Sequence, residues 1–149
     1  MRTPEIGTSH TLEYTVRPED AATFDGEMIH PVYSTPSVVR TMERAARLAL
    51  LPYLEEGEVG AGHEVHVIHR APAPIGAHVR VTATITAHAP RRLTCTTVTN
   101  HGDRVIATGT VVQGIVAAAD FRSRYEAAQD APGPAPGAGA GHRDDPALR

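Results

Sequence analysis

The sequence predicts an α+β domain in which one central helix is wrapped by a curved antiparallel sheet of about five strands. Three observations predict it. Residues 37–51 (SVVRTMERAARLALL) carry apolar side chains at helical spacing, one strand-like segment precedes them, and four strand-like segments joined by short turns follow. The 149 residues suit one domain, and their 41% hydrophobic content can supply its core. The hotdog fold is the economical arrangement of these elements, and a cystatin-like curved sheet also fits them.

Each element has its own signal in the chain. Residues 11–16 alternate polar and apolar side chains, as a half-buried strand does, and the Pro-, Gly- and acid-rich residues 18–31 predict a loop. Ser34, Thr35 and Pro36 are typical of a helix start, and Pro52 ends the only long helix that we expect. Residues 55–62 and 100–103 predict turns, and the strands that follow the helix are expected at 65–69, 79–86, 93–99 and 104–117.

The two ends of the chain are expected to add little to the domain. Residues 1–7 have no apolar pattern, and we expect them to be loose. Residues 131–149 are dominated by Pro, Gly and Ala, which predicts a disordered tail after a domain at 1–130.

Composition excludes several classes of protein. The net charge of −3 and the pI near 6.3 argue against a general nucleic-acid binder. The single cysteine, Cys95, excludes an internal disulfide framework and a metal site made of several cysteines. Neither a signal peptide nor an apolar run of membrane-spanning length is found, so we expect a cytoplasmic protein.

Glu43 stands out on the predicted helix. It shares a face with Val39, Ala46 and Leu50, and a carboxylate on an apolar stripe is costly unless it has a partner or a task. The alternative is an ordinary ion pair with Arg40 or Arg47 on a solvated face.

His69 ends an apolar strand just before a proline-rich turn. An imidazole there is either structural or a group that transfers protons near neutral pH. His63, His66 and His69 are spaced by three, which sends neighbours to opposite faces of a strand, so we expect no metal site.

Thr35 has two compatible interpretations. A Thr before Pro at a helix start is an ordinary N-cap. A hydroxyl there also lies at the positive end of the helix dipole, where a developing oxyanion is stabilised.

The segment from Tyr33 to Gly76 resembles the fluoroacetyl-CoA thioesterase family. The shared features are a hydroxyl residue before the helix, a Met-Glu pair inside it, Pro-Tyr-Leu at its end and a Gly seven residues before a strand-terminal His. The combined spacing, 8 residues from Thr35 to Glu43 and 26 from Glu43 to His69, makes the resemblance specific. Weaker similarity extends over roughly Leu12 to Phe121.

The resemblance implies a hotdog fold, hydrolysis of an acyl-CoA or acyl-carrier thioester, and a site at a homodimer interface. It implies that Thr35, Glu43 and His69 are catalytic and that Gly62 lies near the acyl group, where its N–H can donate to the thioester carbonyl. It implies no cofactor, with coenzyme A entering as part of the substrate. Whether Glu43 is a nucleophile or a general base, and whether Thr35 attacks or orients, stays open.

Arg91 and Arg92 open a predicted strand. They are either part of a solvated edge or contacts for the phosphates of coenzyme A, which guanidinium groups suit well.

The chain departs from the family at two places. The segment before the helix is shorter than the family's phenylalanine-bearing lid and keeps only Phe24 and Tyr33 as aromatics, and Gln113 stands where the family has an arginine. Both departures indicate a different acyl group.

Two other functions fit the fold. One is a non-catalytic module that binds acyl thioesters, and it predicts that Glu43 and His69 lie in different surroundings or pair with arginines. The other is a hotdog hydratase or dehydratase, whose usual Asp and His pairing at the start of the helix is missing from this chain.

Overall fold

The structure, a computed structural model, describes residues 1–129. The expected boundary at residue 130 and the expected tail at 131–149 therefore lie outside the described residues. The elements are β1 (Ser9–Thr15), β2 (Ala21–Phe24), β3 (Glu27–Tyr33), α1 (Thr35–Leu50), β4 (Glu58–His69), β5 (His78–Ala89), β6 (Arg92–His101), β7 (Arg104–Ala117) and α2 (Ala118–Gln129).

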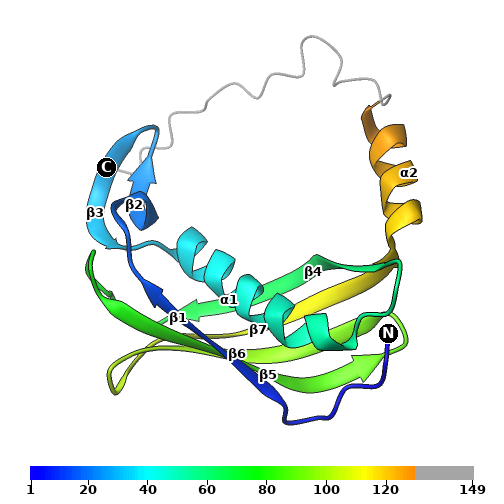
Figure 1. Cartoon of the computed structure of the whole chain (residues 1–149). Helices are drawn as coiled ribbons and strands as arrows, with labels where there is room; N and C mark the ends of the chain where they lie inside the picture. The colour runs from blue at the N-terminus through cyan, green and yellow to red at the C-terminus, as the bar shows by residue number, and fades with distance from the viewer. Residues whose placement is uncertain (130–149) are drawn as a thin grey trace.

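One curved antiparallel sheet forms the body of the molecule, in the order β1-β5-β6-β7-β4. Helix α1 crosses its concave face (Figure 1). The helix buries an apolar side that includes Val38, Met42 and Leu50, and the strands beneath it bury alternate side chains such as Val79 and Val81. The predicted architecture of one central helix and a five-stranded sheet is confirmed.

The start of α1 differs in one detail from expectation. Ser34 is the N-cap, and its Oγ accepts a hydrogen bond from the backbone N–H of Ser37 at 3.3 Å. Thr35 is the first residue of the helix, so its interpretation as the N-cap is wrong. Its hydroxyl is thereby left for another contact. After Leu50 the chain tightens into one 3-10 turn, Leu51–Tyr53, which accommodates Pro52.

The loop expected at residues 18–31 is largely structured. A short 3-10 turn (Pro18–Asp20) leads into the β2–β3 hairpin. Its tight turn uses Asp25 (φ 51°) and Gly26 (φ 84°), the two positive φ angles that a type I′ hairpin turn requires. The Asp-Gly pair was the signal that the sequence analysis missed.

Three other expectations are corrected. The first residues are not loose, because the N-terminal ammonium of Met1 pairs with Glu55 at 2.8 Å and with Glu58 at 2.6 Å. Residues 55–62 are not all turn, since β4 begins at Glu58. A second helix, α2, follows β7 and was not expected; it buries no residue, and Phe121 and Tyr125 are its only large apolar side chains. No described helix is long and apolar enough to span a membrane.

The hairpin and α2 project from opposite ends of the body, on the side where α1 lies (Figure 1). The base of the hairpin is held by Asp20, which is fully buried. Its carboxylate accepts hydrogen bonds from the Tyr14 hydroxyl at 2.6 Å and from the Arg17 backbone N–H at 2.9 Å, and it forms an ion pair with Arg40 on α1. Burial alone would raise the pKa of Asp20, but these hydrogen bonds and the Arg40 charge outweigh it and lower that pKa.

Asp20→Asn should therefore destabilise the fold at pH 7, by about 2 kcal/mol, because a hydrogen-bonded charge is lost from a buried place. A lowered folded-state pKa gives stability that is present above the unfolded-state value of about 3.9 and is lost as pH falls through the folded-state value. The difference between variant and wild type should accordingly shrink at acid pH. Urea unfolding at several pH values measures it. Glu13→Gln, which breaks the exposed pair with Arg80, is the control and should change little; an equal loss in both variants would contradict the assignment.

Candidate active site

Thr35 and His69 meet at the N-terminal end of α1. The Thr35 hydroxyl and Nδ1 of His69 are 2.9 Å apart, a normal hydrogen bond. Helix α1 provides the hydroxyl at its first residue, and β4 provides the imidazole at its last. A hydroxyl that is hydrogen-bonded to an imidazole can pass a proton to it. The structure thus brings together two of the three residues that the sequence analysis singled out.

The two ring nitrogens of His69 have different surroundings. Nδ1 contacts the Thr35 hydroxyl, whereas Nε2 is buried and has no hydrogen-bond partner among the described residues. Nδ1 is therefore the nitrogen for which the structure shows a partner in proton transfer.

Glu43 meets Gly62, two turns further along α1. A Cβ built on Gly62 would lie 2.1 Å from Oε1 of Glu43, so only glycine leaves room for this carboxylate above β4. A neighbouring glycine, Gly60, is also tight, since its Cβ would lie 2.6 Å from Cδ2 of Leu50. The expected turn glycine at 62 is therefore a strand residue whose role is close approach.

A bulge makes this geometry possible. Gly62 precedes His69 by seven residues, and in a regular strand an odd separation would place them on opposite faces. His63 has no partner in the β4–β7 register, which jumps from Gly62 to Glu64. This extra residue turns Gly62 back to the face that His69 occupies.

Glu43 is half-buried, and among the described residues no ion pair joins it to an arginine. Arg40 is engaged by Asp20, and Arg47 donates to the backbone oxygen of Gly60 at 3.2 Å. The ion pair that the sequence analysis weighed as the alternative for Glu43 is therefore absent from the part of the chain that the structure describes.

A cavity of about 240 Å³ opens beside Glu43. Three arginines of α1, two glycines of β4 and one glutamine of β7 complete its lining: Arg40, Arg44, Arg47, Gly60, Gly62 and Gln113. Gln113 comes from β7, directly opposite Gly62 in the register, and is 2% exposed. The sequence marked Gln113 only as a departure from a family pattern and gave it no place in the site. Arg47 was considered only as an ion-pair partner of Glu43, and Arg44, the residue after Glu43 on the helix, was given no role.

Within one chain the two pairs stay apart. Eight residues of α-helix separate Thr35 from Glu43, a rise of about 12 Å along the axis. The carboxylate and the hydroxyl–imidazole pair also line different cavities.

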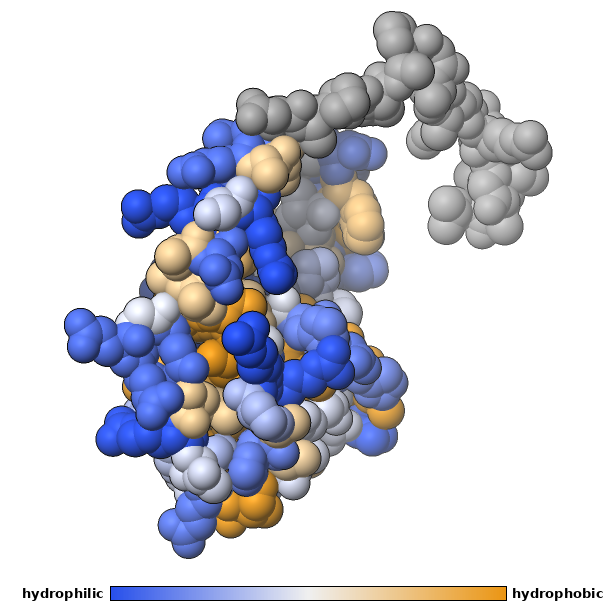
Figure 2. All heavy atoms as spheres, turned by 90° about the vertical axis from the view of Figure 1, so that its right-hand side faces the viewer, coloured by the Kyte–Doolittle hydropathy of each residue, from blue (hydrophilic) through white to orange (hydrophobic). Residues whose placement is uncertain are grey.

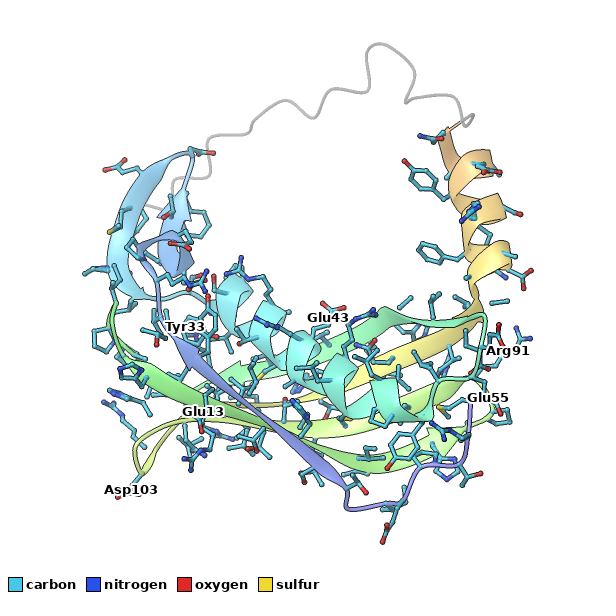
Figure 3. All side chains as sticks on the ribbon, viewed as in Figure 1. Glu13, Tyr33, Glu43, Glu55, Arg91 and Asp103 are labelled. Atoms are coloured by element: carbon cyan, nitrogen blue, oxygen red, sulfur yellow. The ribbon has the colours of Figure 1, made fainter. Side chains whose placement is uncertain are left out.

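The two arginines suggested for coenzyme A lie elsewhere. Arg91 and Arg92 are exposed at the turn between β5 and β6, and neither lines the cavity beside Glu43. In Figure 3, Glu43 points out from the middle of α1 toward β4, whereas Arg91 lies at the far end of the sheet, close to Glu55.

A second depression adjoins the first at Gly62. Phe121 and Tyr125 of α2 form one wall, and β4 and β7 form the other. Figure 2 shows apolar side chains in a hollow below α2, flanked by hydrophilic ones. Both aromatic residues are at least half exposed. Within residues 1–129, no group of three or more His, Cys, Asp or Glu side chains is arranged to hold a metal ion.

Comparison with known proteins shows the family and the fold of the chain. Residues 16–119 match the fluoroacetyl-CoA-specific thioesterase family. The chain is 33% identical to the fluoroacetyl-CoA thioesterase of Streptantibioticus cattleyicolor over 93 residues, which are 62% of this chain and 67% of that protein. A crystal structure of a thioesterase superfamily member from Thermus thermophilus superposes with a TM-score of 0.84 at 33% identity, covering 87% of this chain and 96% of that one.

A solved structure of fluoroacetyl-CoA thioesterase superposes with a TM-score of 0.78 at 28% identity, covering 87% of this chain and 99% of that one. The family match spans most of the described residues and includes both α1 and β4. The chain is a hotdog-fold thioesterase and belongs to the fluoroacetyl-CoA-specific thioesterase family.

Proposed function

We propose that this protein hydrolyses the thioester of a short acyl group carried by coenzyme A or an acyl carrier, and that Thr35, Glu43 and His69 do the chemistry at a homodimer interface. One observation carries the proposal: α1 and β4 present a hydroxyl–imidazole pair and an unpaired carboxylate on one face. A proton-transfer pair and a carboxylate are the groups that thioester hydrolysis needs.

A homodimer would bring the Thr35–His69 pair of one chain close to Glu43 and Gly62 of the other. Strand β4 is an edge strand with twelve residues, and a long unpaired edge favours pairing with a second chain. When the bulged His63 is left out of the count, His66 lies midway between Gly62 and His69. A two-fold axis at His66 would set Gly62 of each chain opposite His69 of the other, at cross-strand distance.

The same axis serves the helices. Val39 lies midway between Thr35 and Glu43 on α1. Thr35 contacts His69 and Glu43 contacts Gly62. Val39, midway between the two helix residues, therefore lies over His66, midway between the two strand residues. Two antiparallel α1 helices packed across that axis would bring Glu43 of one protomer to the hydroxyl–imidazole pair of its partner. Exposed Phe121 and Tyr125 on α2 offer further apolar surface for such an interface.

The chemistry follows from this arrangement. In the direct route a water oxygen adds to the thioester carbon, the C–S bond breaks, and the thiol leaves with a proton while the acyl group leaves as its acid. In the covalent route a Glu43 oxygen adds first, and the C–S bond breaks to give the thiol and an acyl–Glu43 anhydride. Water then cleaves this anhydride, which releases the acid and restores Glu43. His69 accepts and returns protons through Nδ1 and the Thr35 hydroxyl. Backbone N–H groups at the start of α1 and near Gly62 are placed to stabilise the oxyanion. The mechanism uses no cofactor, since coenzyme A is part of the substrate.

The relatives of this chain and the residues around the site limit which substrates are expected. A solved structure of the related fluoroacetyl-CoA thioesterase contains fluoroacetate and CoA, which supports a coenzyme A thioester here. Of the two aromatics in residues 22–34, directly before α1, Tyr33 is fully buried and Phe24, 71% exposed, is the one free to reach a substrate. An acyl group other than fluoroacetyl is therefore proposed. Arg91 and Arg92 remain candidates for the coenzyme A phosphates only if the nucleotide extends to the β5–β6 turn.

Loss of either acid–base group should abolish turnover while leaving the fold intact. His69→Ala and Glu43→Gln should each lower kcat by about 100-fold or more, the scale of general acid–base catalysis. Thr35→Ser should cost less than Thr35→Ala, because serine keeps the hydroxyl. A thiol-reactive dye with a panel of short acyl-CoAs measures the rates, and thermal melts report the fold.

Preserved turnover with a lowered melting temperature would reduce these residues to structural ones and favour a non-catalytic binding module. Consumption of an enoyl-CoA without thiol release would favour a hydratase.

Mixing two inactive variants tests the composite site. In a heterodimer of Glu43→Gln and His69→Ala, one of the two sites carries both changes and the other carries neither. After the chains are exchanged at random, activity should return to about one quarter of the wild-type value. If each site lay within a single chain, the mixture would stay inactive. Light scattering on the same samples shows whether the dimer exists at all.

Gly62→Ala should disable Glu43 without unfolding the sheet. The added Cβ would meet the flexible end of the Glu43 side chain, which can move away at little cost in stability but leaves its working position. The expected result is a loss of kcat close to that of Glu43→Gln. Gly114→Ala is the matched control on the paired strand, because its nearest atom would lie at an ordinary 3.7 Å. Equal activity of the two variants would show that the position of Glu43 is not critical.

A further inference from the structure

The proposed reaction assigns no role to the buried side-chain amide of Gln113. Its side chain is 2% exposed, yet its Nε2 has no hydrogen-bond partner among the described residues. A buried donor without an acceptor costs free energy unless a ligand supplies the acceptor. Gln113 lines the same cavity as Glu43, so the acceptor would come from whatever fills that cavity.

The orientation of the amide follows from its neighbours. A Cβ built on Gly60 would have Oε1 of Gln113 at 3.5 Å and Nη1 of Arg47 at 3.9 Å, so both atoms lie against this glycine. The guanidinium is positive and favours the amide oxygen, not the NH₂ group, on its side. The free N–H bonds are thus left for the cavity.

Depth in the cavity decides which part of a substrate Gln113 meets. Glu43 is half-buried and the helix arginines are exposed, whereas Gln113 is almost fully enclosed. If the thioester carbon stops at Glu43, the part of the substrate that reaches further is the acyl chain. The cavity measures about 240 Å³, which is smaller than the roughly 300–1,000 Å³ of common ligand pockets, so we expect this chain to be short.

We propose that Gln113 selects the acyl group, and that its amide donates a hydrogen bond to an uncharged oxygen, a hydroxyl or a keto group, on a short acyl chain. This inference rests on the proposed function. A plain alkyl chain would leave the amide N–H of Gln113 without an acceptor. A pocket built to hydrogen-bond its substrate discriminates strongly against an analogue that lacks the polar group. Of the arginines in the lining, Arg40 is engaged by Asp20 and Arg47 by the Gly60 oxygen. A carboxylate would therefore meet the like charge of Glu43 with Arg44 alone to offset it. Gln113 is therefore a specificity-determining residue, not a further catalytic one.

Three coenzyme A thioesters of similar size test the proposal: butyryl-CoA, 3-hydroxybutyryl-CoA and malonyl-CoA. Wild-type kcat/KM should be highest for the hydroxyacyl compound. Gln113→Met, which keeps the length of the side chain and removes its polar atoms, should lower the ratio of hydroxyacyl to butyryl kcat/KM by about 10- to 100-fold. The fall in kcat/KM should be smallest for butyryl-CoA, whose alkyl chain accepts no hydrogen bond from the amide.

Thr97→Val is the matched control. Thr97 lies on β6, is 1% exposed, has an Oγ1 without a partner among the described residues, and does not line the cavity. Its substitution should leave the substrate ratio unchanged.

Each other outcome overturns a different claim. An unchanged ratio in Gln113→Met, an equal fall for all three substrates, or a wild-type preference for malonyl-CoA would refute the role of Gln113 while the thioesterase activity stands. Absence of hydrolysis by the wild-type protein of every acyl thioester, on coenzyme A and on an acyl carrier, would instead remove the proposed function, and this inference with it.

Discussion

The bulge at His63 is the constraint on which the candidate site depends. Without it, Gly62 and His69 would face opposite sides of β4, and α1 could contact only one of them. With it, one face of one strand carries a glycine under Glu43 and an imidazole beside Thr35. The glycines at 60 and 62 extend the effect, because they remove the side chains that would otherwise separate helix from strand. Glu43 and Gln113 both line the space that these glycines leave.

The sequence predicted the parts of the fold that depend on periodic burial. Helix α1 and strands β1, β5, β6 and β7 each bury alternate or helically spaced side chains, and each lies close to its expected range. Features without such a pattern were missed. Helix α2 buries nothing, the β2–β3 hairpin is short and mostly exposed, and the first half of β4 is rich in glycine. Met1 docks through its charged terminus, which leaves no trace in hydropathy.

The candidate site was predictable only as a set of residues. Family spacing singled out Thr35, Glu43 and His69, and chemistry suggested a role for each. It could not reveal that Thr35 contacts His69 while Glu43 lies apart from both, over Gly62, because this depends on where α1 crosses β4. Nor could it show that Ser34 caps the helix and so releases the Thr35 hydroxyl. The arginines were the hardest to assign: Arg40 is held by Asp20, which lies 20 residues away, and Arg47 by a backbone oxygen of β4.

The Asp20 contact links the fold to the chemistry of Glu43. Arg40 lines the cavity that Glu43 lines, and the two residues are three apart on α1, a spacing at which opposite charges pair readily. Because Asp20 is fully buried and Glu43 is half exposed, Asp20 gains more from the guanidinium than Glu43 would. Arg40 therefore holds the β2–β3 hairpin against the helix and is kept from neutralising the carboxylate. One buried acid, Asp20, thus stabilises the wall of the candidate site and keeps Arg40 from pairing with the other acid, Glu43.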